Sequence, residues 1–336
     1  MANFKYKISV LTVTYGDRWK FLSQVIERLL KYDEVDNIIV FNNASTYNVT
    51  QKATLFNDSR ITVINSEENL GSAGGYKTAI KYAFENKDND FIFLLDDDNL
   101  PRENVISNLL QQWDVTAGAN NKKALFCLRE DRRQHVKITK GANPYRYYLM
   151  PDNFLGFSIL RIFKNQFNKL LDKFNNKQGI AQSTVIPYAP YGGMFMHREL
   201  IADIGYPDEK FYLYVDDSEY TYRITQNGGK IWIIPQCGIV DIDKSQGIGY
   251  KPRFLHSALL DQWNFRIYYH IRNRVYFYSR VAIKNKLIFR LNKSLYLAFL
   301  YVISVFSAKQ KEYKKLLFAV NDGLEGNLGK ANETKF

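Results

Sequence analysis

Three consecutive aspartates, Asp96, Asp97 and Asp98, directly follow the apolar residues 91–95. Alternate residues of an extended chain point the same way, so Asp96 and Asp98 can converge on one cation. Carboxylate oxygens suit Mg²⁺ or Mn²⁺, and α/β proteins bind ligands beyond the carboxyl ends of their strands. The triplet therefore predicts a divalent metal ion held against a phosphate-bearing ligand. A solvated acidic turn before Pro101 is the alternative.

A second acidic group comprises Asp216, Asp217 and Glu219, with Arg223 one turn later. Acidic residues are favoured at helix N-termini, so helix capping is one interpretation. A carboxylate in a cleft can also act as a general base toward a hydroxyl nucleophile. The bend expected at Gly192-Gly193 would let a substrate approach the backbone there.

Two polar segments also follow predicted strands. Residues 69–75 read Asn-Leu-Gly-Ser-Ala-Gly-Gly and open a helix, an arrangement that can admit an anion or simply allow tight packing. They lack the spacing of a dinucleotide fingerprint or a P-loop. Residues 41–45, with Asn42 and Asn43, could contact a base or ribose, or could cap the next helix.

These groups require an α/β scaffold to position them. Strand patterns occur at residues 8–13, 37–41, 61–64, 91–95 and 124–128. Apolar residues at helical spacing predict helices over 19–31 and 73–85. This alternation predicts a mostly parallel sheet with helices on both faces.

The composition is that of a packed globular protein, with 46% hydrophobic residues in a chain of 336. Cys127 and Cys237 lie in apolar surroundings, so we expect core residues of a reducing compartment and no disulfide framework. We recognise no signal peptide before the first strand pattern, which agrees with a cytoplasmic location.

Positive charge is concentrated at the C-terminal end. Residues 254–336 contain 14 Lys and Arg against five Asp and Glu, which supplies most of the net charge of +12. Aromatic residues are interleaved, and the apolar stretch 295–307 is shorter than the roughly 20 residues that span a bilayer. We expect this region to contact an anionic membrane surface, or to mediate self-association. The amphipathic stretch 159–174 could pack on its own domain or lie on a membrane.

The residues together resemble the inverting glycosyltransferases of family 2. The resemblance rests on the triplet Asp96-Asp97-Asp98, the loop 69–75 and the acids 216–219. Trp263, followed by Tyr-Tyr-His-Ile-Arg-Asn-Arg at 268–274, is similar to bacterial galactofuranosyltransferases. The end segment with Asp322, Gly323, Gly326 and Gly329 is shared with these and with related rhamnosyltransferases.

The resemblance implies a GT-A fold, a Rossmann-like α/β domain over residues 1–252, followed by a helical, basic and aromatic region over 253–336. It implies a nucleotide-sugar donor, a Mn²⁺ or Mg²⁺ cofactor, and Asp217 as the catalytic base. The remaining expected roles fall into three sets. Acceptor binding is expected of Asp216, Glu219, Gly193 and Trp263; donor binding of Thr14, Tyr15, Asn42, Asn69, Gly71, Asp96 and Asp97; metal binding of Asp98, Asp96 and Asp241.

Two departures from the family pattern alter these expectations. Relatives commonly have Asp where Asn42 stands, so base recognition is expected to differ. Galactofuranosyltransferases place a metal-binding His after the strand that here reads 231–234, whereas this chain has Asp241 and Asp243 nearby.

The resulting prediction is inverting transfer of galactofuranose from UDP-galactofuranose to a lipid-linked surface-polysaccharide acceptor, at the cytoplasmic face of a bacterial membrane. Transfer of rhamnose from dTDP-rhamnose is the alternative. Paired carboxylates also suit a glycosidase, but that chemistry needs no metal bound to a diphosphate. A basic, aromatic-rich nucleic-acid-binding protein is a remoter hypothesis, and we expect no nucleic-acid partner because no known module is recognisable.

Overall fold

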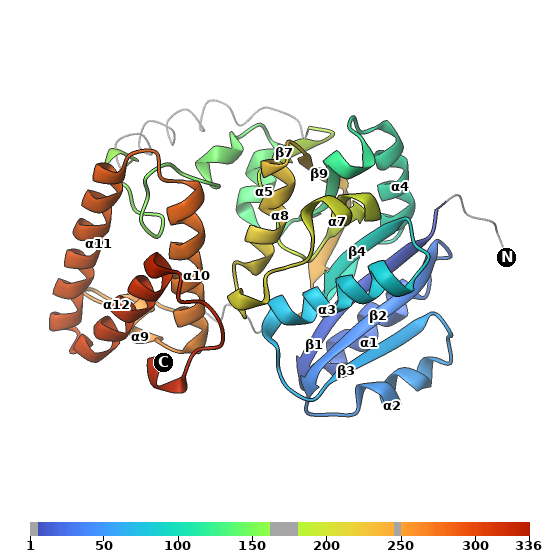
Figure 1. Cartoon of the computed structure of the whole chain (residues 1–336), viewed down its shortest axis with the longest axis horizontal. Helices are drawn as coiled ribbons and strands as arrows, with labels where there is room; N and C mark the ends of the chain where they lie inside the picture. Colours follow the sequence, from blue (N-terminus) through green and yellow to red (C-terminus); the bar gives the residue numbers. More distant parts are fainter. Residues whose placement is uncertain (1–5, 162–180, 245–249) are drawn as a thin grey trace. The chain divides into compact units, whose positions relative to one another are not determined.

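The computed structural model describes residues 6–161, 181–244 and 250–336 (Figure 1). The chain forms two compact units. Unit 1 comprises Met1–Pro144, Ile180–Glu209 and Asp216–Gln246, and unit 2 comprises Tyr145–Gly179, Lys210–Val215 and Gly247–Phe336. The sequence prediction placed one division at residue 252, whereas unit 2 also takes two earlier segments of the chain.

The described part of unit 1 is built on a nine-stranded sheet with the order β3-β2-β1-β4-β8-β6-β9-β5, and β7 pairs with β9. The strands β1, β2, β3 and β4 are parallel, as are β6 and β9, while β8, β5 and β7 run antiparallel to their neighbours. The predicted mostly parallel α/β fold is confirmed. The strands are β1 Ile8–Gly16, β2 Val35–Ser45, β3 Ile61–Ser66, β4 Phe91–Asp96, β5 Asn99–Pro101, β6 Lys123–Arg129, β7 Thr184–Ile186, β8 Met194–His197 and β9 Lys230–Asp241.

Helices cover both faces of this sheet. Apolar side chains of α1 and α4 share one buried cluster with Val10 and Phe93. Helix α3 packs on the opposite face, where a side chain at Gly75 would overlap Val13 and Phe41. The described helices of unit 1 are α1 Trp19–Leu29, α2 Val49–Ala53, α3 Gly71–Asn86, α4 Val105–Val115, α5 Arg133–Thr139, α7 Arg198–Ile204 and α8 Asp216–Gln226.

The parallel register aligns the ends of the central strands. Thr14 of β1 lies opposite Asn42 of β2, and Asn42 lies opposite Asn65 of β3. On the other side of β1, Val13 lies opposite Asp96 at the end of β4. The polar residues that follow the strand patterns therefore meet at the carboxyl ends of the parallel strands.

Unit 2 has its own buried core, formed around α10 and α12. A loop is tied to α11 through Asn292, whose amide donates to the Asp152 carbonyl (2.7 Å) and accepts from the Ile159 amide (3.0 Å). The described helices of unit 2 are α9 Ala258–Asp261, α10 Phe265–Val281, α11 Lys286–Phe306 and α12 Gln310–Glu325. Most of the amphipathic stretch 159–174 lies outside the described residues.

Helix α11 is longer than the apolar stretch 295–307 suggested. It has 21 residues. Among the described helices, it is the one that is long and apolar enough to cross a membrane, by length and composition. The expectation that this region is too short to span a bilayer is therefore wrong, because the helix begins at Lys286 and includes Arg290 and Lys293. About a quarter of its most apolar window, 28%, is buried inside the protein.

Candidate active site

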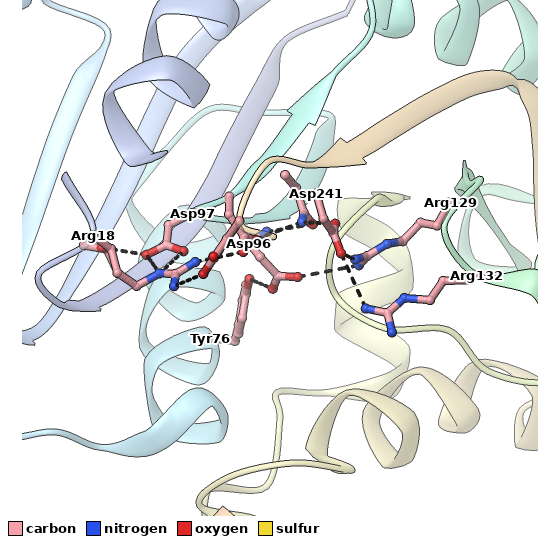
Figure 2. A network of polar contacts seen from close by, with 11 residues as sticks. Arg18, Tyr76, Asp96, Asp97, Arg129, Arg132 and Asp241 are labelled. Atoms are coloured by element: carbon pink, nitrogen blue, oxygen red, sulfur yellow. Dashed lines mark hydrogen bonds and ion pairs between the residues drawn. The ribbon is translucent and has the colours of Figure 1, made fainter. Parts of the chain in front are cut away.

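Arg18 binds three carboxylates at the edge of the sheet (Figure 2). Its Nε lies 2.8 Å from Asp97, its Nη2 2.8 Å from Asp98, and its Nη1 2.8 Å from Asp243. Asp97 also accepts a hydrogen bond of 2.8 Å from the buried Thr14 hydroxyl. Thr14, which was predicted to line the nucleotide, thus contacts the acidic triplet itself.

Asp97 and Asp98 of the triplet are buried, and burial changes their protonation. Burial raises the pKa of Asp97 to about 7 despite the opposing charge of Arg18. Burial and the neighbouring Asp96 charge raise the pKa of Asp98 to about 6. Burial opposes the charge of Arg18, but its aspartate partners hold its pKa above the ordinary value. The cluster retains more acidic than basic groups, a condition that favours an added cation.

Asp96 differs from its two neighbours because its side chain is 42% exposed. Its Oδ1 accepts a hydrogen bond of 3.0 Å from Tyr76, and its Oδ2 lies 3.7 Å from the Arg129 guanidinium (Figure 2). A Cβ at Gly192 would lie 2.6 Å from this Oδ2 and 1.9 Å from Asn99 Oδ1. Only glycine lets the chain pass so close to the acidic edge.

Asp241 of β9 joins the same network. It is ion-paired with Arg129 and lies 3.5 Å from Arg132. The Asn99 amide donates both to Asp98 (3.1 Å) and to Asp241 (2.9 Å). The three predicted metal ligands therefore belong to one polar network, in which Arg129 links Asp96 to Asp241 and Asn99 links Asp241 to Asp98.

The donor set fits a divalent metal ion in its chemistry, since it consists of hard carboxylate oxygens. Among the described residues, no three Asp, Glu, His or Cys side chains lie close enough to enclose an ion by themselves. Mg²⁺ commonly binds one or two carboxylates together with substrate phosphates and water. Asp96, with its exposed carboxylate, and the linked pair Asp98 and Asp241 meet that requirement.

The predicted nucleotide-binding loops are held by asparagine side chains. Asn42 donates to Asn65 (2.8 Å) across the neighbouring strand. The buried Asn43 donates to Asn69 (3.1 Å) and to the Gly71 carbonyl (3.0 Å), so it fixes the loop that enters α3. Tyr15 is exposed, and the Arg18 guanidinium lies 5.8 Å from its ring centre.

Helix α8 begins at the second acidic group, as the sequence predicted. Asp216 is 2% exposed, and its Oδ1 accepts a hydrogen bond of 3.0 Å from Ser72 in the first turn of α3. Its Oδ2 is buried without a hydrogen-bond partner in the described structure. Burial and the adjacent Asp217 charge raise the pKa of Asp216 to about 8, so this carboxyl group is largely protonated at neutral pH.

Asp217 is partly exposed and has a distinct environment. Its Oδ1 accepts from the Ser218 amide (2.6 Å) and hydroxyl (3.1 Å). Burial raises its pKa to about 6, with the charge of Asp96 adding to the shift and that of Arg129 opposing it. Asp217 thus interacts electrostatically with Asp96 and Arg129, and its pKa is close to the optimum for a general base at neutral pH.

The other predicted acceptor-binding residues have structural partners. Glu219 forms a two-point ion pair with Arg223 (2.6 and 2.9 Å). Gly193 adopts a left-handed conformation (φ 104°), and its backbone bonds to Leu94 and Cys127 within the sheet. Trp263 lies in unit 2 at the margin of its apolar core.

Sequence reasoning missed the residues that neutralise and space the acidic groups. Arg129 ends β6, and its position at the carboxyl end of a predicted strand is a signal that could have identified it. Arg18 lies in a loop with no such signal. The rings of Tyr76 and Tyr191 pack together with their centres 4.0 Å apart and their planes inclined by 32°, and both residues appear in the sequence as ordinary aromatic residues.

Comparisons with known proteins agree with this architecture. The model of the family described as Glycosyl transferase family 2 matches residues 9–203. The mannosyltransferase PcManGT from Pyrobaculum calidifontis, solved with GDP-Man and Mn²⁺, superposes with a TM-score of 0.54 at 14% identity, over 96% of this chain and 88% of that one. No curated protein sequence matches the chain.

Two further solved structures share the fold over a smaller part of their own length. GalNAc-T7, solved with UDP, GalNAc and Mn²⁺, has a TM-score of 0.51 at 15% identity, and TarS of S. aureus has 0.50 at 13%. The matches cover 72% and 94% of this chain, but only 44% of GalNAc-T7 and 55% of TarS. At these identities the superpositions show a common GT-A fold.

Proposed function

Because the chain belongs to glycosyl transferase family 2, we propose that it transfers a sugar from a nucleotide-sugar donor to an acceptor hydroxyl, with inversion at the anomeric carbon. The best candidate donor is UDP-galactofuranose, on the resemblance of Trp263 and residues 268–274 to galactofuranosyltransferases. The family match favours this activity over a glycosidase or a nucleic-acid-binding protein.

The relation between Asp96 and Asp217 carries this proposal. Asp96 ends β4 with a half-exposed carboxylate, and Asp217 begins α8 with a pKa raised partly by the charge of Asp96. A metal-dependent transferase needs acidic groups that hold a cation beside the leaving diphosphate, and another acidic group that accepts the proton of the nucleophile. Asp96 and Asp217 meet these requirements, since Asp96 belongs to the acidic cluster that would bind the cation and Asp217 has a pKa near neutrality.

The reaction follows from these two positions. Asp217 accepts the proton of the acceptor hydroxyl through its second oxygen, while Ser218 holds the first. The hydroxyl oxygen forms a bond to the anomeric carbon as the bond to the diphosphate oxygen breaks, and the electron pair leaves with the nucleoside diphosphate. Attack from the face opposite the leaving group inverts the anomeric configuration.

Asp96, Asp98 and Asp241 would hold Mn²⁺ or Mg²⁺, which when bound supplies Lewis-acid stabilisation of the diphosphate. The presence of Mn²⁺ with a nucleotide or nucleotide sugar in PcManGT and GalNAc-T7 supports this assignment. Thr14 and Arg18 hold Asp97 in place. Asn42 and the loop containing Asn69 and Gly71, together with Tyr15, would contact the nucleoside.

A donor screen tests the proposal without knowledge of the acceptor. Purified protein is incubated with UDP-galactofuranose, dTDP-rhamnose, UDP-galactose or GDP-mannose, with Mn²⁺, Mg²⁺ or EDTA, and release of nucleoside diphosphate is measured. We expect metal-dependent hydrolysis of UDP-galactofuranose. Preference for dTDP-rhamnose would reassign the sugar, and the absence of both binding and hydrolysis of every donor would contradict the proposed activity.

The acceptor is proposed to be a lipid-linked surface polysaccharide, with the enzyme bound to the inner face of a bacterial membrane. One side of α11 supports this localisation because its apolar residues are solvent-exposed and recur every three or four positions. They include Leu287, Leu291, Leu295, Phe299, Val302 and Phe306. Exposed Lys286 and Arg290 lie beside them, and an apolar face with basic flanks is typical of contact with anionic lipid.

Vesicle binding tests the membrane contact with the full-length chain. The double substitution Leu291→Ser with Phe299→Ser should weaken binding to vesicles containing anionic lipid at least tenfold, since each buried CH₂ contributes about 0.8 kcal/mol. Exchange of the exposed Leu55 of unit 1 for Ser is the control. Unchanged vesicle binding, with loss of a dimer in analytical ultracentrifugation, would assign this face to self-association instead.

A further inference from the structure

The segment that leads into α8 has an unusual backbone. Tyr212, Tyr214 and Val215 all adopt left-handed conformations, with φ of 62°, 66° and 65°. Left-handed conformations are unfavourable for side chains with a Cβ and most of all for β-branched residues such as valine. A strained segment of this kind persists only where its surroundings hold it, and such strain concentrates at functional sites.

Asn273 of α10 holds this segment. The residue is completely buried, and its side-chain Nδ2 lies 2.8 Å from the Phe211 carbonyl, 2.8 Å from that of Leu213 and 2.9 Å from that of Tyr214. The two N–H groups of this amide are thus shared among three carbonyl oxygens of a single turn.

Arg272 orients that amide group. Its Nε donates to Asn273 Oδ1 (2.9 Å), which directs the Asn273 NH₂ group toward the turn. Its Nη2 donates to the Phe211 carbonyl (3.1 Å) and its Nη1 to the Gly329 carbonyl (2.7 Å). Arg272 is 1% exposed, and no ion pair to it occurs in the described structure, so this buried charge is stabilised by backbone carbonyls, by Asn273 and by the ring of Tyr269, 4.8 Å away. Burying a guanidinium without an acid is costly, which indicates a specific role for these bonds.

We propose that Arg272 and Asn273 are positioning residues, which hold the strained turn 211–215 in the conformation that delivers Asp217 in the first turn of α8. The chain passes directly from Val215 to Asp216 and Asp217, so the turn sets the start of the helix. The inference rests on the proposed function, because Asp217 is the group that needs placing.

A matched pair of substitutions tests the inference. Asn273→Asp keeps the acceptor for Arg272 and removes the NH₂ donor to the turn. Asn292→Asp makes the same change at another fully buried asparagine of unit 2, which donates to the Asp152 carbonyl and accepts from Ile159. Both variants lose a buried NH₂ donor to backbone carbonyls, three of them for Asn273 and one for Asn292, but only Asn273 contacts the turn before Asp217.

Amide hydrogen exchange and turnover give two readouts. Asn273→Asp should accelerate exchange in residues 211–221 and lower kcat for the donor about 10–100-fold, with KM changed less than about threefold, because small displacements of a catalytic group slow the chemical step. Asn292→Asp should accelerate exchange near residues 152–159 and leave kcat within about twofold. Faster exchange with unchanged kcat in Asn273→Asp, or an equal kcat loss in both variants, would overturn the inference.

Val215→Gly provides a second test that does not depend on a destabilised protein. Glycine relieves the left-handed strain, so the melting temperature should not fall, but a looser turn should still lower kcat at least about tenfold. Ala308→Gly, at an exposed left-handed position of unit 2, is the control and should leave kcat unchanged. Full activity of Val215→Gly would show that the conformation of the turn does not matter.

Failure of the proposed function has a different signature. If wild-type protein binds and cleaves no nucleotide sugar, a separate measurement tests whether Asn273 positions Asp217. The titration of the Asp217 carboxyl group is followed by NMR in Asn273→Asp and in Asn292→Asp. The Asp217 titration should change in Asn273→Asp and not in Asn292→Asp. An unchanged titration together with unchanged amide exchange in residues 211–221 would refute the positioning role of Asn273.

Discussion

The aspartates at the end of β4 and the aspartates at the start of α8 have the same side chain but different partners. At the end of β4, Asp97 and Asp98 are ion-paired with Arg18, and Asp96 faces Arg129. At the start of α8, Asp216 accepts from the Ser72 hydroxyl and Asp217 from Ser218, and the described structure shows no ion pair to either. The aspartates after β4 are fixed by guanidinium groups, whereas Asp216 and Asp217 are fixed by hydroxyl and amide groups.

This difference separates two chemical tasks. Guanidinium groups hold the neighbouring carboxylates in place and oppose the rise in pKa that burial causes, which favours the charged form that binds a cation. Asp217 is held by hydrogen bonds to Ser218 and has no ion-pair partner in the described structure, so its second oxygen can accept and release a proton during a reaction. The environment, and not the residue type, distinguishes the binding acids from the base.

The largest expected effect follows from removing the base. Asp217→Asn should lower kcat about 10²–10⁴-fold, the usual contribution of general base catalysis, and leave donor affinity within about twofold. Steady-state kinetics and calorimetric titration with the donor measure the two quantities. Asp88→Asn, which changes an exposed acid paired with Lys7, is the control. Near-normal turnover of Asp217→Asn would remove the distinction between the two groups.

Removal of the main cation tests the other group. Arg18→Ala leaves Asp97, Asp98 and Asp243 without their shared partner, and loss of one member of a buried ion pair commonly costs about 3–5 kcal/mol of stability. The free energy of unfolding in urea should fall accordingly. Arg102→Ala breaks an exposed ion pair with Glu130 and should cost less than about 1 kcal/mol. Equal losses in the two variants would show that the buried cluster depends little on Arg18.

The pH dependence of turnover sharpens the assignment of Asp217. A base must be deprotonated to act, and the pKa of Asp217 is raised to about 6. We therefore expect kcat/KM to rise about tenfold per unit of pH below pH 6 and to level off above pH 7. Initial rates at saturating metal, with stability checked at each pH, measure this profile. A limb centred near pH 4 would indicate an ordinary exposed carboxylate in its place.

Much of the acidic site at the carboxyl ends of the strands could be predicted from the sequence, because local pattern and strand order are sufficient to place it. The apolar residues before Asp96 define a buried strand, and the alternation of strands and helices implies parallel pairing, so the polar ends had to meet. The start of α8 was predictable for a similar reason, since acids are favoured at helix N-termini.

The partners of these acids could not be predicted, because they depend on distant parts of the chain. Arg18 reaches Asp243 across 225 positions, and Arg129 reaches Asp241 across 112. The roles of Arg272 and Asn273 were equally hidden, since the structure buries their polar side chains against backbone carbonyls of a segment about 60 positions earlier in the chain. Pairing of this kind is set by tertiary packing and leaves no local pattern.

The smallest expected effect on turnover belongs to Asp216, and it refines the comparison within α8. The pKa of Asp216 is raised to about 8, so at pH 7 the folded protein mostly carries its neutral acid, which an asparagine side chain resembles in shape and charge. Asp216→Asn should therefore keep kcat within about tenfold of the wild type at pH 7, far above Asp217→Asn.

The same substitution should change how stability depends on pH. Between the unfolded pKa, near 4, and the raised folded value, the native state binds more protons than the unfolded chain, so Asp216 makes wild-type stability fall as pH rises. Asp216→Asn removes this contribution, and its melting temperature should decline less than that of the wild type between pH 5 and pH 8. Thermal unfolding across that range measures the difference. Parallel curves for the two proteins would mean that Asp216 is ionised in the native state, and the α8 acids would then differ less from those of β4 than their hydrogen bonds indicate.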